Sequence, residues 1–126
     1  MKILLDTHGL IWLLEGNAAL TPAARRIISD AEEVSYSSAS VWEIALKWRK
    51  GKLNVQPRVA AQAATQMGLR ECAITQEAIL VSSELASEHG DPFDRLLYAQ
   101  ARCARMRLLT VDEKIPKFGA AVLRAG

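Results

Sequence analysis

The sequence predicts an α/β fold in which a short, parallel central sheet is covered by helices on both faces. Two observations carry this prediction: short apolar runs alternate with helical patterns along the chain, and those patterns begin and end at residues typical of helix caps. Parallel strands need a crossover connection between them, which is usually a helix. At 126 residues, half of them apolar, the chain is expected to form a single domain over residues 1–126.

Five apolar runs are expected to form the strands, because short runs without polar alternation are typical of strands buried on both faces. In chain order they are residues 3–5, 34–37, 69–73, 108–110 and 121–123. The first four are separated by helical segments, as parallel pairing requires.

Six helices are expected, and each has a recognisable start or stop. Helices begin at side chains that accept hydrogen bonds from free backbone amides, often followed by proline, and many end at glycine. The signals are, in chain order, Thr7 to Gly16, Thr21 and Pro22 to about residue 30, Ser38 or Ser40 to Gly51, Pro57 to about Gly68, Thr75 for a helix over residues 77–82, and Asp91 and Pro92 for a helix to about residue 105.

Carboxylates follow two of the expected strands. Asp6 comes directly after residues 3–5, and Asp112 lies two residues after Thr110. In parallel α/β sheets, functional residues gather beyond the carboxyl ends of the strands. A carboxylate beside a buried strand is unfavourable unless it is paired, so a helix cap or a salt bridge is the alternative for Asp6. A simple turn residue is the alternative for Asp112.

The helix over residues 39–50 carries a third acid, Glu43. Its apolar stripe consists of Val41, Ile44, Ala45 and Trp48, and Glu43 lies opposite that stripe with Lys47 four residues later. Periodicity therefore favours a solvated Glu–Lys pair. Trp42 and Leu46 widen the apolar arc, however, so that less of this helix is expected to face water.

The Asp-Pro-Phe-Asp segment holds two more acids. Asp91 precedes Pro92 and is expected to be an N-cap. Asp94 falls in the first helical turn, where the helix dipole favours an acid on the surface, but it also borders the core stripe beside Ala101. Several acids at one place repel one another unless a cation neutralises them, and Mg²⁺ prefers oxygen ligands. If these acids meet, a metal site is the expected explanation.

The densest basic run follows Glu43 and comprises Lys47, Arg49, Lys50 and Lys52. Lys47 and Lys50 share a face with Glu43 and are candidates to hold a phosphate backbone, as is Arg95 beside Asp94. The alternative is a solvated helix end favoured by the dipole. A net charge of +2 permits a nucleic-acid partner without requiring one.

The remaining composition excludes several classes of protein. Cys72 and Cys103 belong to no C-x-x-C pair, so a zinc site is not expected, and both thiols are expected to be buried and reduced. Asp6 and His8 interrupt the first apolar run, which excludes a signal-peptide core. With no apolar stretch long enough for a membrane span, a cytoplasmic protein is expected.

Four segments in order, ILLDTHGLIWLL, SSASVWEIALKWRKGKL, HGDPFDRLLYAQA and LLTVDEKI, resemble a PIN-domain protein, and within that family the VapC-type toxins of toxin–antitoxin pairs. The resemblance covers residues 3–115 and implies an α/β/α sandwich with a parallel sheet. It implies a ribonuclease dependent on Mg²⁺, or on Mn²⁺. The acids that match the family's metal-holding and catalytic positions are Asp6, Glu43, Asp94 and, more weakly, Asp112.

Other positions match or depart from the family pattern. Thr7 occupies the hydroxyl position beside the first acid and is a candidate substrate contact, and Asp91 matches a further, outer acid. Relatives often carry a basic residue where this chain has Val111, which weakens any expected phosphate contact there.

The resemblance also implies partners and products. These are an RNA substrate cut to 5′-phosphate and 3′-hydroxyl ends, a VapB-type antitoxin that covers apolar faces including Trp12 and Trp48, and a homodimer. Three alternatives remain: a non-catalytic PIN module, a nuclease acting on DNA, and a phosphotransfer protein with a strand-end aspartate. The last lacks the expected second aspartate, because Thr7 and His8 follow Asp6.

Overall fold

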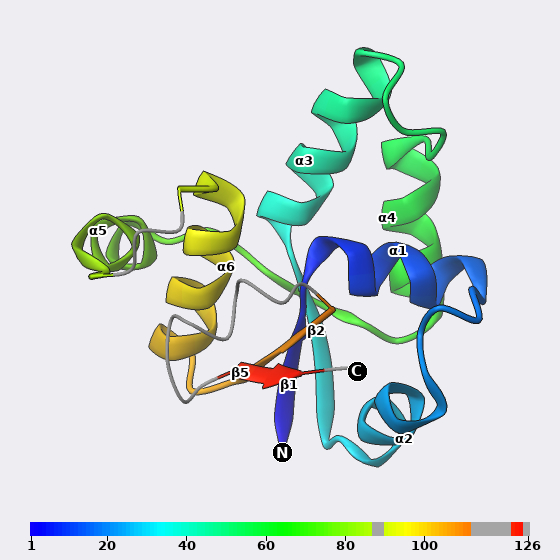
Figure 1. Cartoon of the computed structure of the whole chain (residues 1–126), viewed down its shortest axis with the longest axis horizontal. Coiled ribbons are helices and arrows are strands. Elements are labelled where there is room, and N and C mark those ends of the chain that lie inside the picture. Colours follow the sequence, from blue (N-terminus) through cyan, green and yellow to red (C-terminus); the bar gives the residue numbers. More distant parts are fainter. Residues whose placement is uncertain (87–89, 112–121, 125–126) are drawn as a thin grey trace.

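The computed structural model describes residues 1–86, 90–111 and 122–124. Within these ranges the strands form one five-stranded sheet with the order β3-β2-β1-β4-β5, and every neighbouring pair is parallel (Figure 1). The strands are β1 (Lys2–Leu5), β2 (Glu33–Ser37), β3 (Arg70–Cys72), β4 (Arg107–Thr110) and β5 (Val122–Arg124). The helices are α1 (Thr7–Glu15), α2 (Pro22–Asp30), α3 (Ser38–Arg49), α4 (Pro57–Gln66), α5 (Gln76–Glu84) and α6 (Pro92–Cys103). The predicted parallel α/β fold is confirmed.

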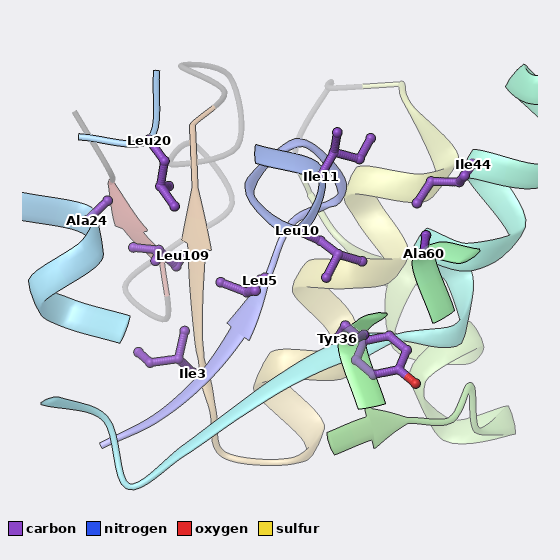
Figure 2. Packing of buried hydrophobic residues seen from close by; sticks show 11 residues of the cluster. Ile3, Leu5, Leu10, Ile11, Leu20, Ala24, Tyr36, Ile44, Ala60 and Leu109 are labelled. Carbon is purple, nitrogen blue, oxygen red and sulfur yellow. The ribbon is translucent and has the colours of Figure 1, made fainter. Parts of the chain in front are cut away.

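Successive residues of β1 and β4 point into two different cores, which is why each of these strands contains a continuous apolar run. Ile3, Leu5 and Leu109 belong to a cluster with side chains of α1, α2, α3 and α4 (Figure 2). Leu4 and Leu108 belong to a second cluster with side chains of α6. Since strand side chains alternate between faces, the two clusters lie on opposite sides of the sheet. Figure 1 shows the same arrangement, with α5 and α6 on one side and α1, α2 and α4 on the other.

The central strand β1 fixes where the first acid lies. It pairs with β2 on one side and with β4 on the other, with Leu4 opposite both Ser35 and Leu108. The backbone amide of Asp6 continues the ladder by donating to the Leu109 carbonyl at 3.1 Å. Asp6 therefore lies at the middle of the sheet's carboxyl edge.

Two helix starts differ from the prediction by the same kind of error. Asp6 rather than Thr7 caps α1, and Ser37 rather than Ser38 or Ser40 caps α3. In both, the residue that ends the extended stretch is itself the cap, and the helix begins at the next residue. The caps predicted at Thr21, Thr75 and Asp91 are confirmed.

The two cysteines differ in how far they are exposed. Cys72 is half-buried and Cys103 is exposed, so the expectation of two buried thiols is wrong for Cys103 and only partly met by Cys72. Cys103 lies in the last turn of α6, whose buried residues end at Ala101.

In the described part of the chain, none of the helices has the length and apolar character needed to cross a membrane.

Candidate active site

Asp6 is a buried carboxylate, 3% exposed, with both oxygens held by the protein. Oδ1 accepts the Gly9 amide at 2.7 Å, while Oδ2 accepts the Thr110 hydroxyl at 2.7 Å and the Val111 amide at 3.0 Å. Burial raises the pKa of Asp6, and these hydrogen bonds only partly offset that effect. Carboxylates with perturbed pKa values are concentrated at functional sites, which makes Asp6 a candidate site residue.

Gly9 is a site residue that the sequence analysis missed. A Cβ at this position would lie 2.7 Å from Oδ1 of Asp6, closer than real Cβ atoms approach an oxygen. The absence of a side chain therefore lets the α1 backbone close onto the carboxylate. The available signal was the Asp-x-x-Gly spacing, which puts a glycine where a capping side chain accepts its hydrogen bond.

Glu43 is buried as well, at 6% exposure, which corrects the expectation of a solvated side chain. The expected pairing with Lys47 is present, with Nζ 2.8 Å from Oε2. The other oxygen, Oε1, accepts the Thr7 hydroxyl at 2.7 Å, and that hydroxyl also lies 2.9 Å from Ser40 Oγ. The face of α3 that periodicity assigned to water instead packs against the start of α1.

Thr7 links the first two acids, because it follows Asp6 in the chain and holds Glu43 through its side chain. Its hydroxyl is buried and engaged with protein groups. These contacts favour a positioning role for Thr7 over the predicted substrate contact.

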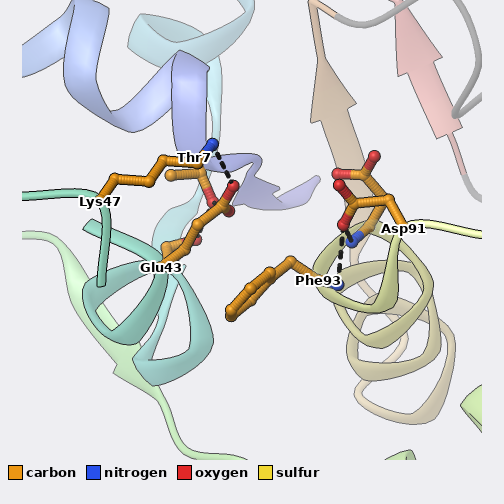
Figure 3. Close-up of polar contacts among 7 residues, drawn as sticks. Thr7, Glu43, Lys47, Asp91 and Phe93 are labelled. Carbon is orange, nitrogen blue, oxygen red and sulfur yellow. Dashed lines mark hydrogen bonds and ion pairs between the residues drawn. The ribbon is translucent and has the colours of Figure 1, made fainter. Parts of the chain in front are cut away.

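The third acid of the candidate site, Asp94, lies at the start of α6. Asp91 is exposed and its Oδ1 accepts the amides of Phe93 and Asp94 at 2.9 and 3.1 Å, as expected of a cap. Asp94 is half-buried in the first turn. Figure 3 shows Glu43 and Asp91 on two sides of the end of β1, with the Phe93 ring directed from α6 toward α3.

The position of α6 is fixed by a buried amide, Gln100. Its Oε1 accepts the Ser37 hydroxyl, and its Nε2 donates to the Cys72 carbonyl at 3.2 Å. These bonds join α6 to the ends of β2 and β3.

The acids do not by themselves form a closed metal cluster. Within residues 1–86, 90–111 and 122–124, no group of three or more His, Cys, Asp or Glu side chains is arranged to hold a metal ion. Asp112 lies outside the described residues. The convergence of Asp6, Glu43 and Asp94 on one ion thus stays a prediction.

The donor chemistry nevertheless fits a hard divalent cation. Asp6 and Glu43 offer carboxylate oxygens at one sheet edge, and the burial that raises the pKa of Asp6 is relieved by a nearby positive charge. At Glu43 the Lys47 ammonium supplies such a charge in this structure. The residues predicted to hold a metal stay Asp6, Glu43 and Asp94.

The three basic residues predicted to contact phosphate have different surroundings in the structure. The guanidinium of Arg95 donates to the carbonyls of Ser82 and Leu85, at 2.9 Å from Nη2 to each, which favours a structural role joining α6 to α5. Lys47 is 43% exposed and paired with Glu43. Lys50 is exposed at the end of α3, and its phosphate contact stays a prediction.

Comparison with known proteins identifies the family. The PIN domain family model matches residues 3–121. Ribonuclease VapC22 from Mycobacterium tuberculosis is 30% identical over 117 residues, which span 90% of this chain and 88% of the relative.

Solved structures with the same fold include VapBC2 from Rickettsia felis bound to a DNA fragment from its promoter (TM-score 0.71, 15% identity, 98% and 97% of the two chains). A toxin–antitoxin complex from Klebsiella pneumoniae is also similar (TM-score 0.68, 20% identity, 96% and 95%). These matches indicate the same fold as the parallel sheet order and the acid at its carboxyl edge. The chain belongs to the PIN-domain family, and its sequence groups it with the VapC-type ribonucleases.

Proposed function

We propose that this chain is a VapC-type toxin endoribonuclease that hydrolyses RNA phosphodiester bonds with a divalent cation. The observation that carries the metal-dependent part is the pair of buried carboxylates, Asp6 and Glu43, at the carboxyl edge of the sheet. Burying a carboxylate is unfavourable, and two of them joined through Thr7 gain from a shared cation.

The protein's own contribution is to orient oxygen ligands. Three hydrogen bonds fix both oxygens of Asp6, and two fix those of Glu43, so neither carboxylate needs to reorganise during the reaction. Mg²⁺ or Mn²⁺ bound there supplies an activated water and stabilises charge on the phosphate oxygens. Asp94 supplies a further carboxylate from α6, and Asp112 is proposed as a fourth.

The proposed protein partner is a VapB-type antitoxin. An apolar groove of about 430 Å³ lies between α3 and α4, lined by Val41, Trp48, Gln56, Pro57, Arg58 and Ala61. Trp48 is 44% exposed there, whereas Trp12 packs partly buried against the core. An amphipathic antitoxin segment in this groove would bury Trp48. A homodimer is proposed from the family alone.

The test is RNA cleavage by the purified chain, with Mg²⁺ and with EDTA. The variants are Asp6→Asn, Glu43→Gln and Asp94→Asn, and the matched control is Asp30→Asn, which removes an exposed acid at the end of α2. We expect Mg²⁺-dependent cleavage that the three site variants lose and the control keeps. Full cleavage in EDTA, or by Asp6→Asn protein, contradicts the proposal.

The same assay separates the alternatives. A non-catalytic PIN module would cleave nothing under any condition. A DNA nuclease would cut a DNA strand of the same sequence at least as fast as the RNA, because carboxylates that hold a metal do not themselves recognise the 2′-hydroxyl.

A further inference from the structure

An exposed aromatic pair spans the two helices that carry Glu43 and Asp94. Trp42 on α3 is 55% exposed, and its ring centroid lies 5.2 Å from that of Phe93 on α6, with 66° between the ring planes. This is an edge-to-face contact. Whichever ring supplies the edge, at least one face of the indole is not used by Phe93.

On both helices, the aromatic residue is the chain neighbour of an acid of the candidate site. Trp42 immediately precedes Glu43, and Phe93 immediately precedes Asp94. Adjacent residues of a helix point about 100° apart, so each ring lies on the helix face next to the one that carries the acid. The Phe93 amide is held by the Asp91 carboxylate at 2.9 Å, and Figure 3 shows its ring reaching from α6 toward α3.

The exposure of the Trp42 side chain is not explained by any role in packing among the residues that the structure describes. A large indole in water forgoes the stabilisation that burial of its apolar surface would contribute. Trp42 also does not line the groove between α3 and α4, which contains Trp48 on a different face of the same helix.

A nucleobase fits this surface, because it is planar, uncharged and attached to the phosphate that the acids would hold. Aromatic side chains stack on unpaired bases, whereas bases inside a duplex are already stacked and cannot reach them. We infer that Trp42, supported by Phe93, is a stacking platform for an unpaired base next to the scissile phosphodiester. This inference rests on the proposed function.

The experiment compares Trp42→Leu with Trp42→Tyr and Trp48→Leu. Leucine keeps an apolar contact for Phe93 but has no ring face, tyrosine keeps a ring, and Trp48 is the matched exposed tryptophan on the same helix. The measurements are the melting temperature, cleavage of a single-stranded RNA and of a duplex, and RNA affinity in an Asp94→Asn background. A stacked base contributes about 1–3 kcal/mol, so Trp42→Leu should weaken single-strand binding roughly 5- to 150-fold.

We expect Trp42→Tyr and Trp48→Leu to bind within about threefold of the parent, less than the 1.4 kcal/mol that a tenfold change represents. RNA should quench tryptophan fluorescence in Trp48→Phe protein, but much less in Trp42→Phe protein. The inference is overturned if Trp42→Leu binds like the parent, if its loss is equal on duplex RNA, or if it changes only self-association. If the wild type cleaves RNA and Trp42→Leu matches it, this inference fails alone; if the wild type neither binds nor cleaves RNA, the proposed function fails with it.

Discussion

The sharpest prediction concerns the hydroxyl that holds Glu43. Thr7→Val keeps the shape of the side chain and removes a buried donor that lies 2.7 Å from Glu43 Oε1. A hydrogen bond to a charged group contributes about 1.5–3 kcal/mol, and leaving a partner unpaired in a buried place adds to the loss. The same hydroxyl lies 2.9 Å from Ser40 Oγ, which is fully buried. Together these losses predict a destabilisation of about 2–4 kcal/mol.

Thermal melting in EDTA at pH 7 measures this effect. For a chain of this size, 1 kcal/mol shifts the melting temperature by roughly 3–5 °C, so Thr7→Val should melt roughly 6–20 °C below the wild type. Thr7→Ser should recover most of the loss, because it keeps the hydroxyl. Thr65→Val is the matched control, since Thr65 is exposed and its hydroxyl contacts only the Ala61 carbonyl of its own helix. If Thr7→Val melts with this control, the Thr7–Glu43 bond does not hold the site and the reasoning is wrong.

Three further predictions follow from the same contacts. Because burial raises the pKa of Asp6 above its ordinary 3.8, the folded protein binds the proton more tightly, so metal-free stability falls as pH rises through the folded-state pKa. The melting temperature of Asp6→Asn relative to wild type in EDTA should therefore increase from pH 4 to pH 7.5, and a difference independent of pH would count against this. Lys47→Gln should lower metal-free stability by about 1–2 kcal/mol, because it leaves the buried Glu43 without its cation, and added Mg²⁺ should stabilise it more than wild type. The exposed Lys50→Gln is its control, and equal melting of the two variants would refute the role of the ion pair. Gly9→Ala places a Cβ 2.7 Å from Asp6 Oδ1 and should reduce kcat on the order of 100-fold by displacing that carboxylate. Gly90→Ala, where a Cβ meets nothing within 4 Å, should cleave RNA at the wild-type rate, and equal rates for the two variants would show that Asp6 tolerates the displacement.

Most of the fold could be predicted because its signals are local. Short apolar runs mark strands buried on both faces, and Thr21 with Pro22, Thr75, and Asp91 with Pro92 mark helix starts within a few residues. Asp6 was found for the same reason, since its position after a strand is visible in the chain. The cap errors at α1 and α3 arose because the residue that ends the extended stretch is itself the cap.

The parts of the site that could not be predicted depend on which elements lie side by side. The periodicity of α3 locates an apolar stripe, but it cannot show that the opposite face is covered by α1, so Glu43 was expected in water. Thr110 donates a hydrogen bond to Asp6 only because β4 pairs with β1, although the two residues are 104 positions apart in the chain. Arg95 resembled a phosphate contact by its place next to Asp94, although its guanidinium is turned toward α5.

The most direct test of the central claim is the chemistry of the RNA ends after cleavage. If a metal-activated water attacks phosphorus, the products carry a 5′-phosphate and a 3′-hydroxyl, and an RNA with a 2′-deoxy sugar at the scissile position is still cut. Attack by the 2′-hydroxyl would instead leave a 2′,3′-cyclic phosphate and a 5′-hydroxyl, and the deoxy substitution would block it. We predict 5′-phosphate ends whose formation requires Mg²⁺ and the Asp6, Glu43 and Asp94 carboxylates. Cyclic phosphate ends formed in EDTA would contradict a carboxylate-held metal as the source of the activity.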